Sequence, residues 1–381
     1  MVISAIFPAI PVFPEQIIEI GQVEKQFSGV VKKKPYDGTI KGCTYIIRPN
    51  SSGGQICYTV KKSLGTGSTA TCYLVHRWKK DLSSMDAEGD CVLKVVRETS
   101  GFCHEVSILQ KIVSHPNIIK PIEAFSIGEI MHLLVLEAGG QTLERAYICN
   151  SESIQTSRTL LPLIRQILEG LKSLHDQKIM HLDIKPRNLV VNRQGHLKII
   201  DFDSSEFGTS YRLGDQERKI TLFYRAPEHD ITGILCPQSD VWSVACTIYA
   251  LITKQYLFYS SGSEETLQRR VDTFMRIFNS LGGSARLFRN SAIIKEYNKT
   301  ASKPLRMTGD CAPHRIWEKQ IVHRGWASLL TSLFQYVDTR PSSEGALALL
   351  PTIEADDAPI AVTMKPQLHE NIKNDSMSTL D

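Results

Sequence analysis

The sequence lacks several features that mark specialised classes of protein. It has no CxxC pair and no His cluster at the spacing of metal ligands, and its nine cysteines are an odd, scattered set. No uninterrupted apolar run reaches the ~18 residues that a membrane-spanning helix needs. These absences argue against a disulfide framework, a structural zinc site and a transmembrane anchor. We therefore expect reduced thiols and a location in the cytosol, the nucleus or both.

Strong net charge is also missing. The 44 Lys and Arg side chains face 40 Asp and Glu side chains, which leaves a net charge of only +4. So balanced a composition predicts no binding to nucleic acid and no binding to membranes. The apolar start of the chain has no basic segment and is interrupted by Pro8, Pro11 and Pro14, which argues against a secretory signal peptide.

What the sequence does contain begins with strand-like patterns. Residues 56–138 hold five short runs rich in Val, Ile and Tyr, separated by turn residues, which predict one small antiparallel sheet. One stretch among them, residues 101–115, carries Val106, Leu109 and Val113 at three- and four-residue steps, which predicts a helix.

Longer helical patterns fill residues 139–350, after a Gly-bearing hinge near 138–140. We therefore predict an α+β fold with a sheet lobe and a larger helical lobe. Residues 1–55 form an extension of unreadable role that contains one strand-like piece, CTYIIRP. Residues 351–381 have the composition of a disordered tail.

Two glycines stand between the first two predicted strands. Gly65 and Gly67 would let backbone N–H groups approach phosphates closely, and Ala70 is the next small position. A GxG in a hairpin turn is common, so Lys94 adds weight: a Lys inside an aliphatic strand is costly to bury without an anion. Glu105, on the predicted helix, would hold the Lys94 ammonium toward phosphate oxygens. The alternative is a surface ion pair, worth ~0–1 kcal/mol.

A second segment combines acids, a base and an amide. Residues 179–203 read IMHLDIKPRNLVVNRQGHLKIIDFD and contain Asp183, Lys185, Asn188 and Asp201. Each of these alone is an ordinary loop residue. Together they offer hard oxygen ligands that suit Mg²⁺ and a cation that suits phosphate.

The order of these motifs resembles that of the eukaryotic protein kinase superfamily over roughly residues 58–350. The resemblance rests on GxGxxA, Lys94, Glu105, HLDIKPRN, DFD, RAPE, the Asp240 of SDVWSVAC and the Arg340 of DTRPS. It implies a bilobal fold whose cleft holds ATP and Mg²⁺. Details such as YRAPE and FMRIFNSLGG are similar to the branch of the cyclin-dependent and MAP kinases.

The resemblance assigns roles to single residues. Asp183 would accept the proton of the substrate hydroxyl, Lys185 would steady the transferring phosphate, and Lys94 would meet the phosphates of ATP. Asn188 and Asp201 match the two metal-binding positions. The nucleotide-binding positions that it implies are Leu64, Gly65, Gly67, Ala70, Cys72, Lys94, Glu105, Glu137 and Val190.

Other matching positions are structural. Thr221 would hydrogen-bond the catalytic Asp and Lys, as in serine/threonine kinases. Glu228 and Arg340 would form a buried ion pair, and Asp240 would tie down the backbone near His181. The expected partners are proteins bearing Ser or Thr, with room for a regulatory protein.

Two positions depart from the family pattern. Leu182 replaces an Arg that pairs with a phosphate on the activation segment, so we expect activity that does not need this phosphate. Asp203 replaces a Gly, and we expect a backbone cost of order 1 kcal/mol and a restricted flip of this segment. The spacing from Lys94 to Glu105 is also shorter than the family commonly shows.

Three functions stay open at this point. The leading hypothesis is a protein serine/threonine kinase that uses ATP and Mg²⁺. The departures at Leu182, Asp203 and Ala70 allow a pseudokinase scaffold with weak or no phosphoryl transfer. A small-molecule phosphotransferase would share the logic of Asp183 and Asp201, but the RAPE motif, which builds a peptide-binding surface in the family, argues against it.

Overall fold

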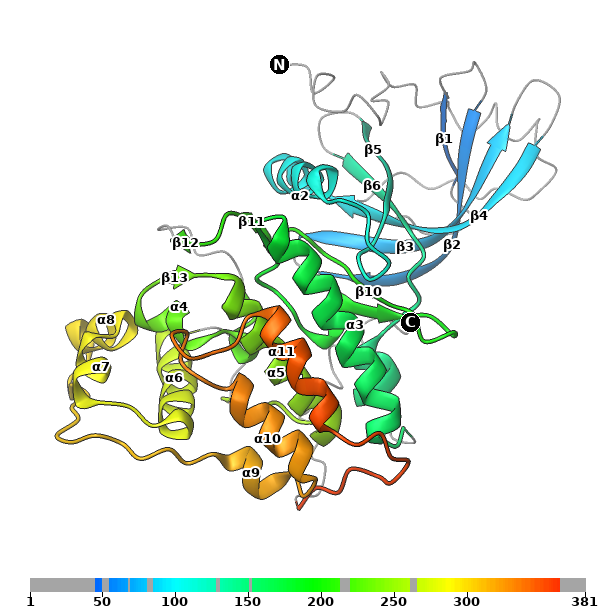
Figure 1. Cartoon of the computed structure of the whole chain (residues 1–381). Coiled ribbons are helices and arrows are strands. Elements are labelled where there is room, and N and C mark those ends of the chain that lie inside the picture. The colour runs from blue at the N-terminus through cyan, green and yellow to red at the C-terminus, as the bar shows by residue number, and fades with distance from the viewer. Residues whose placement is uncertain are drawn as a thin grey trace. The chain divides into compact units, whose positions relative to one another are not determined.

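The computed structural model describes residues 45–49, 55–67, 69–80, 85–127, 131–150, 153–212, 220–260 and 266–363. Two compact units are present (Figure 1). The first holds the described residues up to Lys111 together with Ile119–Ala138, and the second holds Ile112–Ile118 and the described residues from Gly139 onward. Most of the expected N-terminal extension, residues 1–44, lies outside the described residues.

The first unit contains a six-stranded sheet in the order β1-β2-β3-β4-β6-β5, with every pair antiparallel. The strands are β1 Tyr45–Pro49, β2 Gln55–Thr66, β3 Ala70–Lys80, β4 Met85–Val96, β5 Pro121–Ile127 and β6 Met131–Glu137. The predicted antiparallel sheet is confirmed. Strand β1, which the sequence places in the extension, pairs with β2 and adds a sixth strand.

One face of this sheet forms the core of the unit, because side chains two residues apart on a strand point to the same side. Leu93 and Val95 of β4 pack there with Leu133 and Val135 of β6. Lys94 falls between two core residues, so its side chain lies on the opposite face, where it is nevertheless buried.

Helix α2, Thr99–Lys111, follows β4 and buries Val106 and Leu109, as the sequence predicts. The expectation for Val113 is wrong. This side chain lies beyond the end of the helix and is 68% exposed. Its N–H donates to the side chain of Gln177 at 2.7 Å instead of continuing the helical pattern.

The second unit is mainly helical. Its α-helices are α3 Ser157–Asp176, α4 Pro227–Ile231, α5 Pro237–Thr253, α6 Leu267–Leu281, α7 Ala285–Asn290, α8 Ala292–Thr300, α9 Ile316–Gln320, α10 Arg324–Leu333 and α11 Ser343–Leu349. Its single helical turns are η2 Glu144–Ile148, η3 Pro186–Asn188, η4 Leu222–Tyr224 and η5 Leu350–Thr352. Its short strands are β7 Gln141–Thr142, β8 Ile179–Met180, β9 Leu189–Val191, β10 Leu197–Ile199, β11 Glu206–Phe207, β12 Tyr211–Arg212 and β13 Ile234–Leu235.

Two helices organise this unit. Helix α3 begins at a capping box, in which Thr156 and Thr159 exchange side-chain and backbone hydrogen bonds that satisfy free N–H groups. In helix α5, every residue from Ser239 to Thr253 is buried, which is typical of a helix surrounded by the core on all sides. None of the helices in the described part of the chain is long and apolar enough to cross a membrane.

Residues 353–363, here named the C-terminal segment, correct the expectation of a disordered tail from residue 351. Ile353 and Ile360 are buried, at 5% and 7% exposure. The Ile360 N–H donates to the carbonyl of Gln155 at 2.9 Å, next to the start of α3. These apolar contacts and backbone bonds extend the helical unit past residue 350. Residues 364–381 lie outside the described residues.

Candidate active site

The loop between β8 and β9 carries the predicted catalytic Asp. Asp183 is 5% exposed. Its Oδ2 accepts hydrogen bonds from Lys185 Nζ at 2.7 Å and from Asn188 Nδ2 at 2.9 Å. The turn η3 brings Asn188 back toward Asp183, and Pro186 at its start favours the helical turn.

The other carboxylate oxygen of Asp183 faces Thr221, which is distant in sequence. Thr221 Oγ1 donates to Asp183 Oδ1 at 2.9 Å and accepts from Lys185 Nζ at 2.7 Å. The predicted contact of Thr221 with the catalytic pair is therefore confirmed. Donors on both oxygens fix the orientation of the carboxylate.

A backbone hydrogen bond joins the segments that carry the two predicted metal-binding positions, Asn188 and Asp201. The N–H of Ile200, the residue before Asp201, donates to the carbonyl of Asn188 at 2.9 Å. Asn188 uses its Nδ2 twice, toward the carbonyl and the carboxylate of Asp183, and its Oδ1 makes no hydrogen bond within the described chain. An amide oxygen left in this way fits a hard cation such as Mg²⁺, which binds through few protein groups.

Asp240 fixes the backbone of the loop between β8 and β9 through hydrogen bonds. Its carboxylate, which is fully buried, accepts the N–H groups of His181 at 2.9 Å and of Leu182 at 2.7 Å. His175 also contacts it through Nε2 at 2.9 Å. The predicted tie between Asp240 and the backbone near His181 is thus confirmed, and it holds the chain just before Asp183.

Leu182 is buried in an apolar cluster. It packs with Met180, Ile220 and Leu235, and Tyr211 lies against the same group. Its φ is +65°, in the left-handed region that β-carbons disfavour, so the two bonds to Asp240 must hold it there. At the position where the resemblance implies an Arg, Leu182 therefore packs in an apolar cluster with Ile220, just before Thr221.

The expected backbone cost at Asp203 is not found. Asp203 does not have a positive φ, and among its neighbours it is Asp201 that does, at +69°. Strain of order 1 kcal/mol therefore falls on Asp201, the predicted metal-binding position. The Asp203 carboxylate accepts a hydrogen bond from Ser204 Oγ at 3.1 Å.

In the first unit, Lys94 and Glu105 form the predicted ion pair. Lys94 Nζ donates to both carboxylate oxygens of Glu105 at 2.8 Å, and the two side chains are 8% and 3% exposed. Both groups are buried, so this is not the surface ion pair that the sequence left open. A pair of this kind holds the ammonium in one position on the sheet face opposite the core.

The Gly-bearing turn joins β2 and β3 beside this pair. Gly65 has a φ of +152°, which glycine adopts without strain, and the N–H of Gly67 donates to the carbonyl of Ala70 at 2.8 Å. Gly65 is the strand partner of Cys72, and Cys72 is the strand partner of Lys94. Gly65, Cys72 and Lys94 therefore lie side by side on the three neighbouring strands β2, β3 and β4.

The remaining predicted nucleotide positions have different surroundings. Leu64 is 38% exposed near the end of β2. The carboxylate of Glu137, at the end of β6, accepts the N–H of Lys120 at 2.8 Å. Its side chain therefore stabilises the backbone just before β5. Val190 of β9 is buried in the second unit, opposite Lys198 of β10.

A buried ion pair anchors the segment after Thr221. Arg340 donates to both oxygens of Glu228 at 2.8 and 2.9 Å, which confirms the predicted pair. Ser239 Oγ also donates to Glu228 at 2.6 Å. Burial by itself would raise the pKa of Glu228, but Arg340 and Ser239 outweigh it and hold the pKa below its ordinary value.

Sequence reasoning missed one ion pair beside the catalytic loop. Arg187 Nε donates to Glu144 Oε2 at 2.6 Å and so links η3 to η2. Arg187 lies within the HLDIKPRN motif, but Glu144 is 43 residues away and lies in no motif, so no signal in the chain points to this pair.

An Asp held by a Lys, an Asn and a Thr, in a chain that also carries a buried Lys–Glu pair beside a Gly-bearing turn, is typical of enzymes that transfer phosphate from a nucleotide. The chain belongs to the protein kinase family, since the model of the protein kinase domain matches residues 58–347. It is also similar to a probable cyclin-dependent serine/threonine-protein kinase of Dictyostelium discoideum, with 29% identity over 295 residues. That match covers 71% of this chain and 20% of the relative, so the chain spans about a fifth of the relative's length.

Proposed function

We propose that this protein is an ATP- and Mg²⁺-dependent kinase that transfers phosphate to Ser and Thr hydroxyls of proteins. The observation that carries the proposal is the joint contact of Lys185 and Thr221 with the carboxylate of Asp183. Such a contact orients a base toward an incoming hydroxyl and places a cation beside it.

Each group in the loop has a distinct task in this proposal. Asp183 accepts the proton of the substrate hydroxyl, and Lys185 offsets negative charge that develops on the transferring group. Asn188 and Asp201 would hold Mg²⁺, and the Lys94–Glu105 pair would hold phosphate oxygens of ATP. ATP would supply the phosphoryl group, with Mg²⁺ balancing its charge.

The test is a phosphate-transfer assay with the purified full chain. We expect transfer of label from γ-labelled ATP to a mixture of proteins, on Ser and Thr but not on Tyr, and only when Mg²⁺ is present. Lys94→Met and Asp183→Asn serve as matched inactive variants. Wild-type transfer no faster than both variants would leave a scaffold that does not transfer phosphate, and labelling of small alcohols instead of proteins would favour a small-molecule kinase.

The apolar setting of Leu182 gives a second expectation. Because Ile220 and Leu235 hold this part of the chain without a phosphate, treatment with a protein phosphatase should leave the activity of the wild-type protein unchanged. The measurement is kcat before and after treatment, with loss of phosphate followed by mass spectrometry. A large drop in kcat on dephosphorylation would contradict this interpretation of the cluster.

A further inference from the structure

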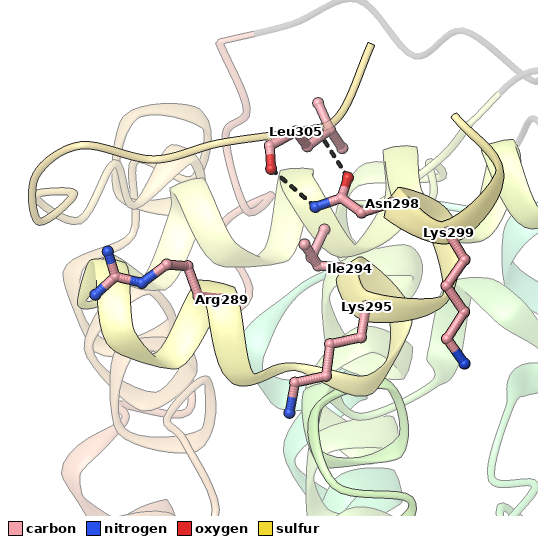
Figure 2. A pocket seen from close by; sticks show the side chains of 6 residues that line it. All are labelled: Arg289, Ile294, Lys295, Asn298, Lys299 and Leu305. Carbon is pink, nitrogen blue, oxygen red and sulfur yellow. Dashed lines mark hydrogen bonds between the residues drawn. The ribbon is translucent and has the colours of Figure 1, made fainter. Parts of the chain in front are cut away.

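A hollow of about 440 Å³ lies on the second unit, and no residue of the catalytic loop lines it. Its lining residues are Arg289 of α7, Ile294, Lys295, Asn298 and Lys299 of α8, and Leu305 in the following segment. Figure 2 shows Arg289 and Lys299 on either side of Ile294, with Asn298 turned toward Leu305.

The shape of this hollow is held by hydrogen bonds and by packing. Asn298 Nδ2 donates to the carbonyl of Leu305 at 3.0 Å, and the Leu305 N–H donates to Asn298 Oδ1 at 2.7 Å. Ile294, at 1% exposure, belongs to a core cluster that includes Phe288, and Leu305 packs against the same cluster. Ile294 and Leu305 therefore form an apolar floor of the hollow, which packs against the core cluster.

The region around the hollow carries more basic than acidic side chains. Residues 284–306 contain six Lys and Arg side chains and one acid, which gives a local charge of +5. The whole chain has a charge of only +4, so all the other residues together carry −1. This region therefore carries a local excess of positive charge.

The three cations that line the hollow have no acidic partner. Arg289, Lys295 and Lys299 are exposed, and no Asp or Glu in the described part of the chain forms an ion pair with any of them. The one acid within residues 284–306, Glu296, lies 3.8 Å from Arg270 instead. Like charges four residues apart, as in Lys295 and Lys299, destabilise a helix, so stability does not explain their placement.

We propose that this hollow binds an acidic segment of another protein. Carboxylates of the segment would contact Arg289, Lys295 and Lys299, and one aliphatic side chain of the segment would lie on Ile294 and Leu305. A nucleic acid fits less well, since no aromatic ring that could stack on a base lines the hollow. This binding does not rest on the proposed kinase activity.

The experiment measures fluorescence anisotropy of a labelled peptide that combines Glu, Asp and Leu, titrated with the full chain. A peptide with Gln and Asn in place of the acids, and a single-stranded oligonucleotide, are titrated in parallel. We expect the acidic peptide to bind most tightly, and its affinity to fall as salt is raised. Absence of binding at low salt, or tighter binding of the oligonucleotide, would overturn the proposal.

Variants of equal charge change locate the binding. The test variant is Arg289→Gln/Lys295→Gln/Lys299→Gln, and the control variant is Arg165→Gln/Arg193→Gln/Arg324→Gln, which changes exposed side chains elsewhere on the second unit. We expect the test variant to bind the acidic peptide about tenfold more weakly or worse, and the control to bind it nearly as well as the wild type.

Equal weakening in the two variants would show only attraction by net charge and would overturn the site. Thermal unfolding of both variants checks that they fold. If the triple test variant does not fold, Lys299→Gln alone is compared with Arg193→Gln in the same titration, and the same difference in affinity is required.

Discussion

Replacing Asp183 with Asn is expected to lower kcat by about 10²–10⁴-fold, the usual contribution of a positioned general base. The amide has nearly the shape of the carboxylate. Its oxygen can still accept from Lys185 and Asn188, while its NH₂ group faces Thr221, whose hydroxyl can turn to accept. The loop should therefore keep its fold and lose only the proton acceptor and the negative charge.

The measurements that check this are kcat from steady-state kinetics, nucleotide affinity by calorimetry and the thermal unfolding temperature. Only kcat should change greatly. Asp338→Asn is the matched control, since Asp338 is exposed and forms no ion pair with the described residues. A kcat for Asp183→Asn equal to that of the control would contradict the proposed role of Asp183.

Replacing Arg340 with Met is expected to lower the free energy of unfolding by about 3–5 kcal/mol, because it leaves the buried carboxylate of Glu228 without its partner. The loss includes more than the ion pair. Arg340 also donates to the carbonyls of Gln335 and Gln238, and it lies 5.0 Å from the ring centre of Trp242. Urea unfolding followed by circular dichroism measures the change.

A double-mutant cycle separates the pair from its surroundings. Glu228→Gln/Arg340→Met should be less destabilised than the two single changes added together, since neither charge is then left alone. Arg324→Met, which changes an exposed Arg on α10, should alter the free energy of unfolding little. Additive losses in the cycle would mean that Arg340 acts through packing and backbone contacts and not through Glu228.

The same pair predicts a dependence of stability on pH. The pKa of Glu228 in the folded protein is below its ordinary value of 4.5, so its contribution is fully present above that value. As pH falls through the lowered pKa, the folded state must take up a proton that it binds weakly, and the contribution is lost. The stability advantage of the wild type over Glu228→Gln should therefore be largest near neutral pH and shrink under acid conditions.

Much of the site could be predicted from the sequence because its chemistry is carried by short motifs. A Lys inside an aliphatic strand requires an anion, so residue type and position already point to the pair of Lys94 with Glu105. Asp183, Lys185 and Asn188 lie within six residues of one another, so their contact needs only a local turn. Helix α3 also follows from its apolar periodicity, and helix α5, which is buried on all sides, follows from the length of its apolar run.

Backbone conformation and distant contacts could not be predicted in the same way. The strain expected at Asp203 lies at Asp201 and Leu182, because φ depends on contacts with distant residues, such as the hydrogen bonds that Asp240 accepts from His181 and Leu182. The apolar environment of Leu182 depends on Ile220 and Leu235, which the sequence places more than thirty residues away. Composition likewise gave little sign that residues 353–363 pack on the helical unit, since the apolar run of residues 358–362 is short and follows Glu354, Asp356 and Asp357.

The C-terminal segment matters to anyone who shortens this chain. Ending the chain at residue 347, where the match to the kinase domain ends, would remove the residues that pack against the start of α3 and against the backbone at the end of α9. The carbonyls of Gln155 and Gln320 would then have only water to bind, and Ile321 would lose its neighbour Val362. A shortened protein of this kind would expose apolar side chains and unpaired backbone carbonyls. We expect it to aggregate during purification, although every predicted catalytic residue remains in it.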